Sequence, residues 1–235
     1  MQCGDLISEA PSRTAIDPRE AAAKPDFSAA LYGHLFPAPL MVFVWPDGAE
    51  LNEELRPRIL EHASQSSGMN KSNAGGWHSE VGRLEFCGDA GQRLVRHMFE
   101  MADEATRRTI AELPSSQRKT RWTFRWVLHA WANVNGPGDF NRYHAHAGST
   151  WSGCYYVDTG APADDGDGTP LHFYDPCQGR ANTFLQPMVP ATHLLRPKPG
   201  MMVLFPSYMP HMVVPHQGAR QRISIAFNLR KDPFP

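Results

Sequence analysis

Hydrophobic and polar residues alternate along the middle of the chain. Between Arg121 and Asn135 every even-numbered position is apolar, whereas the odd-numbered positions include arginine, histidine and asparagine. Successive side chains of a β-strand point to opposite faces, so this pattern predicts a long strand with one apolar and one mostly polar face. The apolar face consists of Trp122, Phe124, Trp126, Leu128, Ala130, Ala132 and Val134.

Shorter apolar segments on either side predict further strands. We expect them over residues 40–45, 152–157, 171–174, 201–205, 211–214 and 222–229. Turn signals separate them, such as Pro46-Asp47-Gly48, Gly136-Pro137-Gly138-Asp139 and Pro197-Lys198-Pro199-Gly200. Many short strands divided by such turns are typical of a β-sandwich or barrel of the jelly-roll kind.

Two segments in the first half of the chain show helical spacing instead. The first helix is expected to follow Asn52 as its N-cap, and the second to run from about residue 91 to 113 and to stop before Pro114. The apolar positions at helical spacing are Leu55, Ile59 and Leu60 in the first and Leu94, Met98, Met101 and Ala105 in the second. The expected fold class is therefore mainly β with supporting N-terminal helices.

Composition adds the expected domain organisation and location. Residues 1–30 have no stable period, which predicts a loose N-terminal arm, and residues 31–235 suffice for one domain. With 23 basic and 24 acidic residues the formal net charge is −1, which argues against binding to nucleic acid or to an anionic membrane. The four cysteines show no pairing, no apolar run approaches the roughly 20 residues of a membrane span, and no signal peptide is evident, so we expect a cytoplasmic protein.

The candidate chemistry starts at His144-Ala145-His146. In an extended segment the two-residue period places both imidazoles on one face, with Cβ atoms about 6.6 Å apart. Imidazole binds Fe, Zn, Cu and Ni, so the pair indicates a first-row metal without selecting one. Taken alone, the pair is also compatible with a structural or accidental arrangement.

Two later segments add polar residues to this pattern. His211 follows a hydrophobic strand and a tight bend, and Arg222, Ser224 and Asn228 share one face of the last expected strand. A planar guanidinium on an inward face can bind a carboxylate through two hydrogen bonds, and Ser224 can donate another. The alternative is a structural arginine paired with a buried acid.

In order and spacing, these segments resemble the Fe(II)/2-oxoglutarate-dependent dioxygenase superfamily, in particular a subgroup of 2-oxoglutarate/Fe(II) oxygenases from bacteria and phage. The motifs that carry the resemblance are Leu35-Phe36-Pro37, Ser72-Asn73-Ala74-Gly75-Gly76-Trp77, Trp131-Ala132-Asn133-Val134-Asn135, His144-Ala145-His146 with Ser152-Gly153, and Arg222-Ile223-Ser224 with Phe227-Asn228. The resemblance implies a double-stranded β-helix, a cupin-like jelly roll, over residues 31–235. It also implies Fe(II) bound by His144, His146 and His211, and the co-substrate 2-oxoglutarate bound by Arg222 and Ser224.

The sequence departs from the superfamily's usual His-x-Asp or His-x-Glu, because His146 stands where the carboxylate is expected. Three neutral imidazoles leave the double charge of Fe(II) uncompensated, although the dianionic co-substrate can offset it. Alternatively, His146 does not bind the metal, and a carboxylate such as Asp175 or Asp139 completes the ligand set. The sequence leaves both arrangements open.

Other polar residues near these motifs have more than one possible role. Asn133 and Asn135, on the polar face of the long strand, are candidates to bind the other carboxylate of the co-substrate or the substrate, or else they close a turn with Gly136. The polar segment 72–77 is expected to be a connection rather than a flap over the substrate. Tyr155 and Tyr156 point to opposite faces, so at most one of them lines a pocket.

The function expected from these features is an Fe(II)- and 2-oxoglutarate-dependent dioxygenase. It would oxidise, most often by hydroxylation, a C–H bond of an unidentified small-molecule or peptide substrate and release succinate and CO2. One alternative is a three-histidine, cupin-like dioxygenase without 2-oxoglutarate, against which Arg222 argues. Another is a non-catalytic jelly-roll module that binds a metal or a ligand. A second copy of the chain, in a homodimer, is a candidate partner.

Overall fold

The structure, a computed structural model, describes residues 38–117, 125–161, 168–177 and 192–232. These residues belong to one unit of the chain, 38–235. The expected arm over residues 1–30, the motif at 35–37 and the first part of the expected strand, 121–124, lie outside the described residues. The division of the chain at residue 31 therefore stays a prediction.

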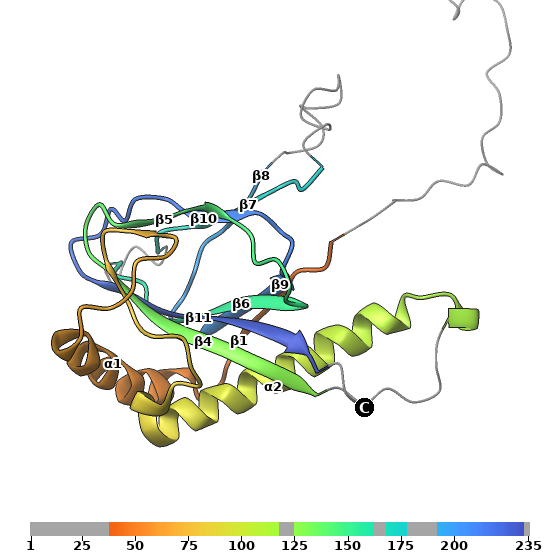
Figure 1. Cartoon of the computed structure of the whole chain (residues 1–235), viewed down its shortest axis with the longest axis horizontal. Helices are drawn as coiled ribbons and strands as arrows, with labels where there is room; N and C mark the ends of the chain where they lie inside the picture. Colours follow the sequence, from red (N-terminus) through yellow and green to blue (C-terminus); the bar gives the residue numbers. More distant parts are fainter. Residues whose placement is uncertain (1–37, 118–124, 162–167, 178–191, 233–235) are drawn as a thin grey trace, which may run out of the picture. The chain divides into compact units, whose positions relative to one another are not determined.

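Two antiparallel sheets face each other in this unit (Figure 1). The larger sheet has the strand order β1-β9-β6-β11-β4-β3 and the smaller sheet the order β2-β5-β10-β7-β8. The strands of the larger sheet are β1 (Met41–Val44), β3 (Trp77–His78), β4 (Trp126–Asn135), β6 (Trp151–Asp158), β9 (Met201–Pro206) and β11 (Arg222–Lys231). Those of the smaller sheet are β2 (Asn73–Ala74), β5 (Phe140–His144), β7 (Leu171–Tyr174), β8 (Thr192–Leu195) and β10 (His211–Val213). The expected jelly-roll architecture is confirmed.

Two α-helices, α1 (Gly48–Gln65) and α2 (Gly88–Ala111), cover the face of the larger sheet that is turned away from the smaller sheet (Figure 1). Two short 3-10 helices, η1 (Glu85–Cys87) and η2 (Ser115–Gln117), flank α2. The expected N-cap at Asn52 was wrong, because α1 starts directly after the Pro46-Asp47 turn and Asn52 lies inside it. None of the helices in the described residues is long and apolar enough to cross a membrane.

The two faces of the larger sheet have different partners. The even-numbered apolar residues of β4 and the isoleucines of β11 form one core with the inner faces of α1 and α2. A second, smaller core fills part of the space between the sheets and includes Leu171, Val203, Phe205 and Val213. Because the helices take up the apolar face of β4 and β11, the polar face of both strands is directed into the space between the two sheets.

Candidate metal centre

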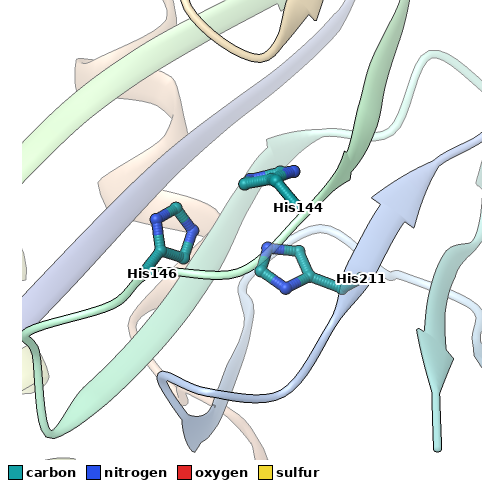
Figure 2. Close-up of side chains that lie close together, drawn as sticks. All are labelled: His144, His146 and His211. Atoms are coloured by element: carbon teal, nitrogen blue, oxygen red, sulfur yellow. The ribbon is translucent and has the colours of Figure 1, made fainter. Parts of the chain in front are cut away.

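Three histidines, two in the smaller sheet and one in the loop after β5, come together in that space. His144 is the last residue of β5, His146 lies two residues further on, and His211 is the first residue of β10 and pairs with His144 across the sheet. Each offers a ring nitrogen, and these nitrogens lie within 4.8 Å of one another. Figure 2 shows the three rings directed toward a common point.

A β-bulge in β5 aims His144 into this space. Val213 pairs with Asn141 and His211 with His144, so β5 advances three residues where β10 advances two. Strict alternation would place Asn141 and His144 on opposite faces, but the extra residue brings both into the lining of one pocket. Sequence periodicity alone carries no signal for this bulge.

Hydrogen bonds orient two of the rings through their Nδ1 atoms. His144 Nδ1 lies 2.5 Å from the carbonyl oxygen of Arg142, and His211 Nδ1 lies 2.9 Å from that of Met209. A carbonyl oxygen can only accept, so Nδ1 must carry the proton and Nε2 is left with a free lone pair. Both rings are therefore held in the tautomer that can bind a metal through Nε2.

All three imidazoles are held in the neutral form that a metal requires. Burial, with a smaller contribution from the charge of His144, lowers the pKa of His146 to about 4. Burial and then the charge of His144 lower the pKa of His211 to about 3. Burial also lowers the pKa of His144. At neutral pH no proton has to leave these groups before a cation binds.

The two carboxylates considered as alternative ligands are used elsewhere. Asp139 Oδ2 accepts a hydrogen bond from Gly136 N at 2.7 Å, and Asp175 Oδ1 accepts one from Cys177 N at 2.8 Å. Neither residue lines the pocket of the three histidines. Among the described residues, the one group of three or more metal-binding side chains is His144, His146 and His211.

Arg222 lies deeper in the same pocket and is only 1% exposed. Its Nη1 donates to the hydroxyl of Ser224 at 3.0 Å, and its guanidinium carbon lies 5.3 Å from the ring centre of Tyr156. Nε has no hydrogen-bond partner, and no carboxylate of the described residues pairs with this cation. The structural alternative of a buried acid partner therefore finds no support in the described residues.

Two further polar atoms in the pocket lack partners, the hydroxyl of Tyr156 and Oδ1 of Asn133. Burial raises the pKa of Tyr156 well above its ordinary value, so the hydroxyl keeps its proton and can donate. An unpaired buried cation next to an unused donor is costly unless a ligand completes the hydrogen bonds. The pocket is therefore suited to an anion with several oxygen atoms.

The structure separates the other sequence candidates. Asn133 lines the pocket, whereas Asn135, which pairs with Arg222 across the strands, does not. Tyr156 faces the pocket, and Tyr155 packs in the core on the helix side. The sequence left open which of the two tyrosines lines the pocket. The strand register decides it, because Tyr156 lies opposite Ser224.

The segment that contains Ser72 and Trp77 links the edges of the two sheets. β2 pairs with β5 of the smaller sheet, and β3 pairs with β4 of the larger one. Its role as a connection agrees with the expectation, and Ser72 also lines the pocket. Gly75 and Gly76 both have positive φ, near 66° and 64°, which only glycine adopts at little cost.

A two-sheet jelly roll with a histidine cluster and a buried arginine between its sheets is the double-stranded β-helix architecture. Residues 129–228, which contain the three histidines and Arg222, match the family model described as "Putative 2OG-Fe(II) oxygenase". This match identifies residues 129–228, somewhat less than half of the chain, with the 2-oxoglutarate/Fe(II) oxygenase superfamily, and the fold of the described residues agrees with it. The chain is accordingly an enzyme that depends on Fe(II) and 2-oxoglutarate, whereas the bacterial and phage subgroup stays a prediction.

Solved structures share the fold at low sequence identity. A prolyl-4-hydroxylase from Pseudomonas putida is 16% identical with a TM-score of 0.58, over 82% of this chain and 92% of that one. A prolyl hydroxylase from Trichoplax adhaerens, in complex with a hypoxia-inducible-factor peptide, is 15% identical with a TM-score of 0.53, over 81% and 83%. HygX from Streptomyces hygroscopicus, with nickel and 2-oxoglutarate bound, is 9% identical with a TM-score of 0.51, over 84% of each chain. No curated protein sequence matches this one.

Proposed function

We propose that this enzyme hydroxylates a C–H bond of its substrate and couples this oxidation to the decarboxylation of 2-oxoglutarate. One O2 molecule supplies one oxygen atom to the C–H bond and one to the succinate that forms, and CO2 leaves. His144, His146 and His211 would hold Fe(II), and Arg222, Ser224 and Tyr156 would bind the carboxylate of 2-oxoglutarate remote from the metal. The observation that carries the proposal is an unpaired, fully buried Arg222 in the same pocket as three neutral imidazoles.

The residues present suit this metal and this co-substrate. Three convergent imidazoles with low pKa values are ligands for a first-row divalent metal, and three protein ligands leave positions open for other groups. Bound Fe(II) supplies the activation of O2 that no side chain can provide. The pocket lies between the two sheets, where His211 and Arg222 are buried.

Charge balance favours a dianionic co-substrate in this site. Three neutral ligands leave the metal with both of its positive charges, and Arg222 adds another that no described carboxylate offsets. The carboxylates of 2-oxoglutarate bring two negative charges. One would meet the metal, and the other would accept hydrogen bonds from the guanidinium, from Ser224 and from Tyr156. This division of charge gives a role to every unpartnered donor in the pocket.

Two other functions are less well supported. A three-histidine dioxygenase without a 2-oxo acid would have no use for the unpaired guanidinium of Arg222. A non-catalytic metal module would be expected to offer a fourth protein ligand, and the described residues place three side chains around the site.

The substrate class is proposed as a small molecule or a peptide. Two of the similar structures are prolyl hydroxylases, and one of these holds a peptide, which supports a peptide substrate without identifying it. A homodimer stays a prediction that size-exclusion chromatography with light scattering would test.

The test is anaerobic addition of Fe(II) and then 2-oxoglutarate to metal-free protein. A chelated 2-oxo acid on Fe(II) gives a visible charge-transfer absorption. We expect this band in the wild type and a weaker band in Arg222→Ala and in His146→Ala, with Asn52→Leu on α1 as a control that leaves it unchanged. A band that survives in His146→Ala would remove His146 from the ligand set. Tight iron binding without a band would refute the use of 2-oxoglutarate.

A further inference from the structure

The Nδ1 atom of His146 has a different kind of partner from those of the other two histidines. For His144 and His211 the partner is a backbone carbonyl oxygen. For His146 it is the side-chain amide of Asn228, whose Nδ2 lies 3.3 Å from Nδ1. Asn228 belongs to β11, 82 positions further along the chain and in the opposite sheet.

Ser152 holds the other end of this amide. Ser152 pairs with Asn228 across β6 and β11, and its hydroxyl donates to Asn228 Oδ1 at 2.7 Å. The amide therefore bridges a hydroxyl and an imidazole. A backbone carbonyl oxygen can only accept a hydrogen bond. The Ser152 hydroxyl and the His146 imidazole can each donate or accept one, so these contacts alone do not fix which ring nitrogen carries the proton.

The direction of these hydrogen bonds decides whether His146 can bind a metal. With Nδ2 donating to Nδ1, a neutral imidazole keeps its proton on Nε2, and that nitrogen has no free lone pair. The two ends of a carboxamide have nearly the same shape, so the side chain can turn by 180° within the same space. Oδ1 then accepts from the Nδ1–H of His146, Nδ2 donates to the hydroxyl of Ser152, and Nε2 is free.

We propose that Asn228, oriented by Ser152, is a positioning residue of the metal site. It sets the Nδ1–H tautomer of His146, so that Nε2 faces His144 and His211, where Figure 2 places the ring. The inference rests on the proposed three-histidine site. It adds that a side chain fixes the tautomer of His146, whereas backbone carbonyl oxygens fix the tautomers of His144 and His211.

The identity of the partner also bears on the charge of the site. A metal-bound histidine that donates to a carboxylate becomes a more basic ligand and carries part of a negative charge to the metal. Asn228 is neutral, so it orients His146 without reducing the positive charge that the site offers to a dianionic co-substrate. Asn228→Asp would keep the acceptor and add the charge.

The first experiment measures metal affinity with Co(II) as the probe, by competition with a chelator in the metal-free full-length protein. Asn228→Leu removes the acceptor and is expected to weaken Co(II) binding about 10- to 100-fold. Asn228→Asp is expected to bind at least as tightly as the wild type, and Ser152→Ala to be weakened less than Asn228→Leu. Asn52→Leu, a matched change on α1, should leave the affinity unchanged.

The second experiment separates positioning from a purely structural role. Nitrogen-15 NMR of histidine-labelled, metal-free protein at neutral pH reports which ring nitrogen of His146 is protonated. We expect a protonated Nδ1 in the wild type and in Asn228→Asp, and loss of that signature in Asn228→Leu while the signals of His144 and His211 stay.

The outcomes distinguish this inference from the function on which it rests. If His146→Ala binds Co(II) as tightly as the wild type, the three-histidine site is wrong. If His146→Ala is weakened but Asn228→Leu is not, the site stands and the role of Asn228 is refuted. Equal weakening in Asn228→Asp and Asn228→Leu would also refute it, because the aspartate retains the acceptor.

Discussion

Replacing Arg222 with methionine should weaken co-substrate binding and leave the unliganded protein as stable as before, or more stable. The two effects have different physical origins. In the complex, the guanidinium meets a carboxylate in a site away from water. In the unliganded protein the same group is a buried cation that is 1% exposed, with one hydrogen bond to Ser224 and an unpartnered Nε.

The loss of binding can be estimated from the type of interaction. Truncation of one partner of a buried, hydrogen-bonded charge pair costs roughly 2–5 kcal/mol. This corresponds to about 30-fold or more in the dissociation constant of 2-oxoglutarate. The unliganded protein should gain up to a few kcal/mol, because replacement of buried charges by apolar groups of similar volume is often neutral or stabilising by about 1–4 kcal/mol.

Thermal unfolding of Mn(II)-loaded protein with and without 2-oxoglutarate reads out both effects. Co-substrate at one hundred times its dissociation constant adds about 2.7 kcal/mol of stability. For a domain of this size the wild-type Tm should rise by roughly 5–10 °C. At the same concentration Arg222→Met, which binds about 30-fold more weakly, should gain at most about 0.9 kcal/mol, a rise of roughly 2–4 °C, and its unliganded Tm should equal or exceed that of the wild type.

Arg93→Met is the matched control. Arg93 pairs with Glu50 and Glu54 on the surface of the helices and lies outside the pocket. It should keep the full response to 2-oxoglutarate and lose at most about 1 kcal/mol of stability. The reasoning would be refuted if Arg222→Met retained the response to 2-oxoglutarate while its unliganded Tm fell by several degrees, because Arg222 would then be structural.

Three further predictions concern the pocket and its supports. Tyr156→Phe removes a buried hydroxyl that has no hydrogen-bond partner in the unliganded protein. A titration with 2-oxoglutarate should therefore show binding weakened about tenfold or more, while the stability of the unliganded protein stays the same. A lower Tm with unchanged 2-oxoglutarate binding would contradict this. The metal-free protein should lose stability as the pH falls below 6.5, by about 1.4 kcal/mol per pH unit for each buried imidazole. The reason is that histidines of the unfolded chain bind protons in this range, whereas His146 and His211 in the folded protein, with pKa values of about 4 and 3, do not. Urea unfolding at pH 7 and pH 5 checks this, and His211→Gln should have the shallower dependence; an unchanged slope would contradict it. Gly75→Ala, whose new Cβ would lie 1.9 Å from Asp139 Oδ1 at a φ of 66°, should lower the Tm far more than Gly148→Ala, which has a φ of 88° but no atom within 4 Å; equal losses would show that backbone strain alone decides.

The local pattern of the sequence determined the fold class and most of the elements. Alternation from Trp126 to Asn135 identified β4 and separated its helix-facing residues from its pocket-facing ones, because burial of one face of a strand leaves a period of two in the sequence. The Gly and Pro turns marked the strand ends. The start of α1 was misplaced, because Asn52 was taken as the cap although the helix begins just after Asp47.

The three histidines, Arg222 and Ser224 were also proposed from the sequence, but Tyr156 and the surroundings of these residues were not. His144, His211 and Arg222 were picked out by order and spacing, whereas the absence of an acid partner for Arg222 among the described residues, and the bulge that turns His144 inward, depend on strand register. The amide of Asn228, in β11 of the larger sheet, lies beside His146, 82 residues earlier and just after β5 of the smaller sheet. Sequence periodicity reports which face of its own strand a residue occupies. Only the packing of one sheet against the other decides which residues of two such faces meet, and therefore which ring nitrogen, cation or hydroxyl is left for a ligand.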